Sequence, residues 1–405
     1  MIIKPMVRNN ICINSHPAGC AAVVRRQIEY AKKALAGTET KKPALALVIG
    51  CSTGYGLASR ICAAFGYGAA TVGISFEKPA SESKPGTPGW YNNLTFDTEA
   101  AKASLLSKTL DGDAFSDAMK ERAIAAVREI AEGIPPQIDL VIYSLASPVR
   151  TDPKTGVTYR SVIKPTGKAY SGKTIDMMTA KFITAGAEPA TEEEIANTVK
   201  VMGGEDWELW IDALEGAGVL SPAARTVAYT YIGPELSWAI YKNGTIGRAK
   251  EDLERACRGI NRRFAGSDRR AWVSVNKALV TRASAVIPII PFYVSCLFRV
   301  MKEKGFHEGC IEQIARLYRD RLYSAGADAD PSKVPVDGEG RIRLDDWEMR
   351  EDVQRETLAR MDSVTGDTIL TATDAAGFRH DFLEVHGFDV EGVDYEKDTD
   401  PLRIN

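Results

Sequence analysis

The 405-residue chain has no excess of charge of either sign. Lys and Arg number 51 against 54 Asp and Glu, which gives a formal net charge of -3. Binding to a nucleic acid or an anionic membrane usually depends on an excess of Lys and Arg, so neither partner is expected. With 44% hydrophobic and 26% charged residues, the chain is expected to fold around a large core.

The chain also lacks the common metal and disulfide motifs. Its seven cysteines are scattered and contain no CxxC pair, which argues against a disulfide framework and a thiolate zinc site. There are four histidines, and His307-Glu308 is not followed by the second histidine of an HExxH motif. We therefore expect a reduced, cytoplasmic protein without a metal.

Long hydrophobic runs are absent as well. The N-terminal residues MIIKPMVRNN contain no apolar stretch of the kind found in signal peptides. The most apolar segment, ASAVIPIIPFYVSCLF at 283–298, has 16 residues and contains Pro288 and Pro291, so it is too short to span a membrane. It is expected to be buried core, and it is also suited to form an apolar wall for a lipid-like substrate.

Short apolar runs alternate with helical patterns from residue 44 to about 150. This βαβα order predicts a parallel, doubly wound α/β sheet with right-handed crossovers. The expected strands are 44–49, 71–76, a third just before Asp113, and 138–144, and the expected helices are 55–65 and 115–132.

The remaining chain departs from this alternation but shows no flexible linker. We expect one elaborated α/β body in four parts: a first half (about 44–150), an inserted lobe (about 151–205), a second half (about 206–300) and a helical C-terminal extension (about 301–405). The insertion is rich in Gly, Pro, Thr and Lys and predicts a hairpin. Further expectations are helices at 192–200 and 206–214, strands at 225–232 and 272–281, and a hairpin-like piece at 336–344.

A glycine-rich turn follows the first predicted strand. Gly50-Cys-Ser-Thr-Gly54-Tyr-Gly56 has the spacing GxxxGxG, which resembles the dinucleotide-binding turn of short-chain dehydrogenases. Glycines let the backbone approach a pyrophosphate, and the following helix offers free N–H groups. Glu77, 21 residues after Gly56, is spaced to meet the adenosine ribose hydroxyls. A carboxylate there favours NADH over NADPH, although the neighbouring Lys78 weakens that preference.

The same turn admits other interpretations. Gly50-Cys-Ser52-Thr-Gly54 also fits GxSxG, the nucleophile elbow of α/β-hydrolases, and His380 or His386 could complete a triad. That interpretation leaves Gly56 and Glu77 unexplained. A purely structural glycine turn is the third possibility.

Two later strand ends are further candidates for the cofactor crevice. Asp113-Ala114 follows the third strand and could face the adenine ring, and Ser144-Leu-Ala-Ser147 offers small side chains beside the ribose and nicotinamide. Ligands of such sheets bind at the carboxyl ends of the strands.

A tyrosine and a lysine nine positions apart form the second motif, in YKNGTIGRAK at 241–250. On one straight helix they would lie on opposite faces. Asn243-Gly244 predicts a break, with a short helix at 235–241 and a second helix capped by Thr245, so the two side chains can meet. The alternative is that Tyr241 borders the core and Lys250 only lies along its surface.

The pair is suited to the reduction of a carbonyl compound. A tyrosine hydroxyl can hydrogen-bond an oxygen that gains negative charge and supply a proton to it. A nearby lysine cation stabilises phenolate character and can hold the nicotinamide ribose. Tyr231, ten positions upstream, is a second phenol that could reach the substrate.

Several stretches together resemble one family over essentially the whole chain. They are GCSTGYGLASRI, SFEK followed by GTPGWYNN, YSLASPVRTDP, VMGGEDW, YIGP, YKNGTIGRAK, VSVNKALVTRASAVIP and HEGCIEQ. The sequence is similar to trans-2-enoyl-CoA reductases and to the related long form of bacterial enoyl-acyl-carrier-protein reductase, with their Tyr-x8-Lys motif.

The resemblance implies an elaborated Rossmann fold, NADH as hydride donor, no flavin and a monomer. It implies hydride transfer to the β-carbon of an enoyl thioester, with Tyr241 as proton donor, Lys250 on the cofactor and Tyr231 on the substrate. It favours CoA over an acyl-carrier protein as the acyl carrier, and the apolar 283–298 segment would shelter the acyl chain. A non-catalytic dinucleotide sensor is a further alternative. The implied NAD site consists of Gly50, Cys51, Ser52, Thr53, Gly54, Tyr55, Phe76, Glu77, Asp113, Ala114, Leu145, Ala146, Lys250, Leu279, Val280 and Thr281.

Overall fold

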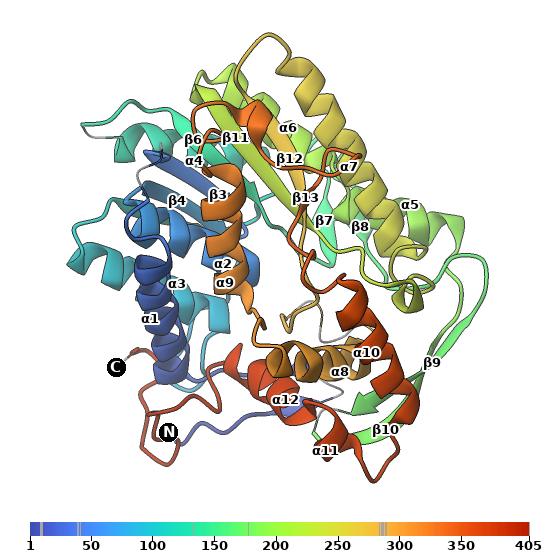
Figure 1. Cartoon of the computed structure of the whole chain (residues 1–405). Coiled ribbons are helices and arrows are strands. Elements are labelled where there is room, and N and C mark those ends of the chain that lie inside the picture. The colour runs from blue at the N-terminus through green and yellow to red at the C-terminus, as the bar shows by residue number, and fades with distance from the viewer. Residues whose placement is uncertain are drawn as a thin grey trace.

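A seven-stranded sheet forms the centre of the molecule (Figure 1). The computed structural model describes residues 1–8, 11–38, 40, 42–131, 133–176, 178–282, 284, 287 and 290–404. All strand pairs of this sheet are parallel, in the order β13-β12-β11-β6-β3-β4-β5. The strands are β3 (Leu45–Ile49), β4 (Ala70–Ser75), β5 (Ser107–Asp111), β6 (Ile138–Tyr143), β11 (Leu220–Thr230), β12 (Arg270–Val275) and β13 (Ile342–Arg343).

The strand order reverses between β3 and β6. From β3 the chain winds outward through β4 to β5, and it then returns to β6 on the other side of β3. The carboxyl ends of β3 and β6 therefore border the crevice in which such sheets bind their ligands. This topology confirms the predicted doubly wound Rossmann fold.

Helices cover both faces of the sheet, which explains why β3 and β4 are buried at every position. One apolar cluster joins the sheet to α1 (Pro17–Ala34), α2 (Gly54–Ile61), α3 (Pro88–Lys102) and α9 (Cys310–Leu317). A second joins the opposite face to α4 (Asp117–Ile130), α6 (Glu205–Gly216) and α7 (Thr245–Arg263). The predicted helix at 115–132 is confirmed by α4, whereas α1 and α3 had not been predicted.

The segment after β6 forms an insertion, as predicted. It contains two antiparallel pairs and one helix. The β9–β10 hairpin packs against α8 (Ile290–Glu303), where the rings of Phe182 and Phe292 meet edge to face at 5.1 Å. The elements are β7 (Val149–Thr151), β8 (Thr158–Arg160), β9 (Tyr170–Asp176), β10 (Lys181–Ala187) and α5 (Glu192–Met202).

The C-terminal helices gather around α8 beyond the carboxyl edge of the sheet (Figure 1). They are α10 (Glu351–Ser363), α11 (Ile369–Ala372) and α12 (Ala375–Glu384). Several residues of the predicted apolar segment lie outside the described residues, but 290–298 lies in α8 and is buried, as expected of core. Over the described ranges, no helix is long and apolar enough to cross a membrane.

Two elements predicted near the β12–β13 edge of the sheet are wrong. The strand expected at 272–281 ends at Val275, because side chains bind the next backbone N–H groups: Lys277 N donates to Gln313 Oε1 at 3.3 Å and Ala278 N to Glu348 Oε2 at 2.7 Å. The hairpin expected at 336–344 is instead a turn followed by β13, which adds to the edge of the main sheet parallel to β12.

Candidate active site

The glycine turn between β3 and α2 is built on close backbone contacts. Gly50 and Gly54 have φ values of 87° and 55°, which disfavour any residue with a side chain. A Cβ atom on Gly50 would lie 2.3 Å from the carbonyl oxygen of Ser144, and one on Gly56 would lie 1.8 Å from the Gly50 carbonyl oxygen. The glycines therefore hold the N-terminus of α2 against the point where the strand order reverses.

This helix N-terminus is suited to bind a phosphate group. Thr53 is the N-cap residue of α2, but its side chain makes no capping hydrogen bond. The first N–H groups of the helix thus remain available to an anion. Cys51 is buried beneath the turn, and Tyr55 points its hydroxyl away, donating to the Lys277 carbonyl oxygen at 3.0 Å. These residues fit the pyrophosphate of a dinucleotide.

Glu77 stands beside the turn, after the end of β4. The Ser52 hydroxyl donates to Glu77 Oε1 at 2.7 Å, and the guanidinium of Arg282 lies 3.4 Å from the same oxygen. Phe76 leaves 77% of its surface exposed next to this carboxylate. An exposed ring beside a held carboxylate fits the adenosine of NADH.

The other predicted cofactor residues lie around the same edge. Asp113 and Ala114 follow β5, and Leu145 and Ala146 follow β6. Leu279 and Val280 are buried, and the Cγ2 atom of Thr281 lies 3.7 Å from the position of a Cβ atom on Gly54. The structure thus brings the 279–281 loop next to the β3–α2 turn, more than 200 residues away in the sequence.

A hydrolase would need a histidine base beside Ser52, and the two candidate histidines have other partners. His380 Nδ1 lies 3.0 Å from Asp389 Oδ2, and His386 Nδ1 lies 3.1 Å from the Phe382 carbonyl oxygen. In the part of the chain that the structure describes, the Ser52 hydroxyl has no histidine partner, and it donates to Glu77 instead. A Ser-His-acid triad is not assembled.

The helical structure is interrupted between Tyr241 and Lys250, as the Asn243-Gly244 pair predicted. The helix expected at 235–241 is wrong, however, because only a 3-10 turn at Glu235–Ser237 forms before a series of turns. Two backbone N–H groups, of Gly244 and Gly247, donate to the Tyr241 carbonyl oxygen at 3.1 and 3.0 Å. This folds the chain back on itself directly behind Tyr241.

Helix α7 then begins at Thr245, with Gly244 as its N-cap residue. Thr245 had been predicted as the cap, but its hydroxyl donates to the Val162 carbonyl oxygen at 2.5 Å. A hydrogen bond to the inserted segment thus engages the hydroxyl that would otherwise cap the helix. The same hydrogen bond fixes the start of α7.

Tyr241 and Lys250 flank this fold-back, and among the described residues no hydrogen bond joins them. Tyr241 is 8% exposed, and burial raises the pKa of its hydroxyl. Among the described residues this hydroxyl has no hydrogen-bond partner. Lys250 Nζ donates to the Tyr229 carbonyl oxygen at 3.1 Å, at the end of β11, and burial lowers its pKa to about 8.

Tyr231 links Tyr241 to a residue of the C-terminal region. Its ring meets that of Tyr241 edge to face, with centroids 5.1 Å apart. Its hydroxyl donates to Glu348 Oε1 at 3.0 Å. Glu348 was not predicted from the sequence, because an isolated acidic residue in a polar stretch belongs to no motif.

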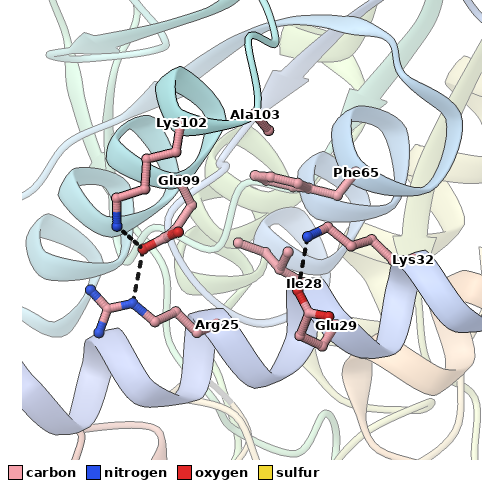
Figure 2. Close-up of a pocket in the computed structure, with 8 residues that line it drawn as sticks. All are labelled: Arg25, Ile28, Glu29, Lys32, Phe65, Glu99, Lys102 and Ala103. Carbon is pink, nitrogen blue, oxygen red and sulfur yellow. Dashed lines mark hydrogen bonds and ion pairs between the residues drawn. The ribbon is translucent and has the colours of Figure 1, made fainter.

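A pocket of about 250 Å³ lies elsewhere, between α1 and α3 (Figure 2). It contains none of the predicted site residues. Its charged side chains pair with one another: Glu99 accepts from Arg25 at 2.9 Å and from Lys102 at 3.0 Å, and Lys32 donates to Glu29 at 2.8 Å. We assign this pocket no part in the site. In the described ranges no cluster of His, Cys, Asp or Glu could hold a metal ion.

Three family models match the chain in succession. Residues 2–82 match the "NAD(P)H binding domain of trans-2-enoyl-CoA reductase" and residues 84–323 match the "Trans-2-enoyl-CoA reductase catalytic region". Residues 336–399 match the "Enoyl reductase FAD binding domain".

Full-length relatives agree with these matches. The chain is 57% identical over 403 residues to the trans-2-enoyl-CoA reductase [NADH] of Treponema denticola, covering 99% of both chains. It is 53% identical over 402 residues to the enoyl-[acyl-carrier-protein] reductase [NADH] of Flavobacterium johnsoniae, covering 99% of this chain and 98% of the relative.

Solved structures are similar over the same length. The T. denticola reductase in complex with NAD has a TM-score of 0.94, covering 99% of this chain and 98% of that one. The Clostridium trans-2-enoyl-CoA reductase in complex with NADH is 42% identical, with a TM-score of 0.93 and the same coverage.

The segment matched by the FAD-binding model does not fit a flavin dinucleotide. Within 336–399 the only strand is the two-residue β13, and no glycine-rich turn leads from it into a helix. Gly387 has a φ of 75°, but a Cβ atom there would lie 2.5 Å from the His16 carbonyl oxygen, so it serves packing against α1. The glycine-rich turn of the dinucleotide-binding kind lies between β3 and α2.

Proposed function

Because the chain belongs to the trans-2-enoyl-CoA reductase family, we propose that it reduces the carbon–carbon double bond of trans-2-enoyl-CoA with NADH, giving the saturated acyl-CoA. The observation that supports this most directly is the meeting of three features at one sheet edge. They are the β3–α2 glycine turn, the carboxylate of Glu77, and the buried Tyr241, whose hydroxyl has no partner among the described residues.

The cofactor is assigned to the carboxyl ends of the strands. NADH, when bound, supplies the hydride. The N-terminus of α2 would hold the pyrophosphate, Phe76 and Glu77 the adenosine, and Lys250 the nicotinamide ribose. Since Glu77 is a carboxylate, it would repel the 2′-phosphate of NADPH.

Tyr241 is assigned to the thioester oxygen. Addition of hydride to the β-carbon moves negative charge onto that oxygen, and a hydrogen bond from the Tyr241 hydroxyl would stabilise the enolate. Because burial raises the pKa of Tyr241, the hydroxyl stays protonated and can donate. The α-carbon is then protonated to complete the reduction, while Lys250 contributes a positive charge near the phenol.

Two further assignments follow the sequence prediction. Tyr231 would contact the substrate beside Tyr241, and α8 would shelter the acyl chain with its buried apolar residues. We also propose that the chain acts as a cytoplasmic monomer in fatty acid or butyrate-type metabolism, with the four-part organisation described above.

The proposal is tested by NADH consumption with crotonyl-CoA against crotonyl-acyl-carrier protein. We expect the CoA thioester to be the better substrate. Faster turnover of the carrier-protein thioester would instead make the chain an enoyl-acyl-carrier-protein reductase. NADH binding without consumption of either thioester would indicate a dinucleotide sensor and contradict the proposal.

The role of Tyr241 is tested in the same assay. Tyr241→Phe removes the hydroxyl but keeps the ring, so kcat should fall by about 100-fold or more. NADH affinity should change by no more than about twofold, because the ring still packs. Tyr30→Phe, on the exposed side of α1, serves as the control and should keep full activity. A Tyr241→Phe variant that works at the normal rate would remove Tyr241 from the mechanism.

A further inference from the structure

Glu348 lies buried behind Tyr231 and receives three hydrogen bonds. Its Oε1 atom accepts from the hydroxyls of Tyr231 at 3.0 Å and Tyr293 at 2.7 Å, and its Oε2 atom accepts from the backbone N–H of Ala278 at 2.7 Å. The side chain has no exposed surface. A buried carboxyl is costly unless its oxygens are satisfied, and here both are.

The directions of these hydrogen bonds can be read from their neighbours. Gln354 Nε2 donates to the Tyr293 hydroxyl oxygen at 3.0 Å, so the hydrogen of Tyr293 points to Glu348. A backbone N–H can only donate, so Ala278 also presents a hydrogen. The site therefore requires an acceptor at both oxygens, which a carboxylate provides and an amide does not.

The hydroxyl hydrogen of Tyr231 is consequently already donated to Glu348. Burial, and then the neighbouring Glu348, raise the pKa of Tyr231, so it remains a phenol that donates to the carboxylate. The neighbouring Tyr241 hydroxyl, by contrast, has no partner among the described residues. Within the described part of the chain, Tyr241 is thus the one of these two phenols whose hydrogen is not already donated.

We propose that Glu348 is a positioning residue that holds the Tyr231 hydroxyl and thereby leaves Tyr241 as the proton donor. This inference rests on the proposed reductase function. It gives the C-terminal segment 336–399 a part in the reduction that requires no flavin: the turn before α10 supplies the carboxylate that orients a substrate-contacting tyrosine.

The test is a double-mutant cycle in the crotonyl-CoA assay. Glu348→Gln removes the negative charge and turns an amide NH2 toward either the Ala278 N–H or the two tyrosine hydroxyls, so the Tyr231 hydroxyl is held less firmly. We expect kcat/KM for crotonyl-CoA to fall by about tenfold or more, with KM for NADH little changed. In a Tyr231→Phe background the same Glu348→Gln substitution should change kcat/KM by less than about twofold.

Asp206→Asn is the matched control. Asp206, in the first turn of α6, is another buried carboxylate that accepts from a tyrosine hydroxyl, that of Tyr143 at 3.1 Å, and it also accepts from Lys120 Nζ at 3.1 Å. Its loss should lower the melting temperature without a comparable loss of kcat/KM. An equal loss of kcat/KM from Glu348→Gln with and without the Tyr231 hydroxyl would overturn the proposal.

A second readout requires no turnover, and so separates this inference from the reductase function. Absorbance titration of phenolate should show two tyrosines, Tyr231 and Tyr293, ionising at lower pH in Glu348→Gln than in the unsubstituted protein, because the negative charge beside both is removed. In the Tyr231→Phe background the difference should shrink to one tyrosine. A difference of the same size with and without the Tyr231 hydroxyl, or coinciding titration curves for Glu348→Gln and the unsubstituted protein, would show that Glu348 does not act on Tyr231.

Discussion

Tyr231 and Tyr241 show how two chemically identical side chains acquire different properties. Both are buried, and burial raises the pKa of each. The Tyr231 hydroxyl is engaged by a carboxylate, whereas the Tyr241 hydroxyl has no hydrogen-bond partner among the described residues. The difference comes from hydrogen-bond partners contributed by distant parts of the chain and is independent of the residue type.

Lys250 leads to a prediction at the same scale. Its pKa is lowered to about 8 by burial, so the ammonium is charged below about pH 8 and becomes neutral as the pH rises through that value. We expect kcat/KM for NADH to fall above about pH 8, since a neutral lysine holds the ribose less well and no longer stabilises phenolate character. The measurement is the pH profile of kcat/KM, which reports the free enzyme.

Lys250→Arg provides the control for this profile. A guanidinium stays charged throughout the accessible pH range, so the alkaline decrease should disappear, even if the overall rate is lower. An unchanged decrease in Lys250→Arg would assign the titration to another group.

At the scale of elements, the β3–α2 turn depends on the absence of side chains. Gly50 and Gly56 let three backbone segments meet, and this contact aims the α2 N-terminus at the switch point of the sheet. The turn between Tyr241 and α7 has the same character, because a Cβ atom on Gly247 would lie 1.7 Å from the Lys242 carbonyl oxygen. Both halves of the site are thus positioned by close backbone contacts.

Gly56→Ala tests this dependence. The added methyl group would collide with the Gly50 carbonyl oxygen at 1.8 Å, and neither backbone segment can move without displacing the start of α2. We expect NADH affinity to fall by about tenfold or more and the melting temperature to drop, as measured by fluorescence titration and thermal unfolding.

Gly216→Ala, at the end of α6, is the matched control. A Cβ atom there meets nothing within 4 Å, and its backbone is helical. It should leave NADH affinity unchanged and affect stability by less than about 1 kcal/mol. Normal NADH affinity in Gly56→Ala would show that the turn does not position the cofactor.

At the scale of the whole molecule, the C-terminal region is part of the catalytic body. The helices after residue 350 pack around α8, and the N-terminal ammonium of Met1 donates to the Thr399 carbonyl oxygen at 2.8 Å, which joins the two ends of the chain. Figure 1 shows both termini on the same side, below the sheet. Through Glu348, this region also accepts a hydrogen bond from Tyr231, which follows the carboxyl end of β11.

The absence of flavin remains a prediction at this scale. Since residues 336–399 form no glycine-rich turn between a strand and a helix, we expect the purified protein to carry no FAD and to reduce crotonyl-CoA with NADH alone. The measurement is the flavin fluorescence released on denaturation, alongside activity with and without added FAD. Stoichiometric flavin, or activity that depends on added FAD, would contradict this expectation.

The sequence by itself determined the Rossmann class, the glycine turn with Glu77, and the break between Tyr241 and Lys250. Each depends on local rules: apolar periodicity, the conformational freedom of glycine, and a breaker pair between two helical patterns. Only the tertiary structure decided three other features. Residues 276–281 leave the sheet, the Thr245 hydroxyl donates to the inserted segment, and Glu348 accepts a hydrogen bond from Tyr231. Those outcomes depend on hydrogen bonds between residues 70 to more than 100 positions apart, which no local pattern encodes.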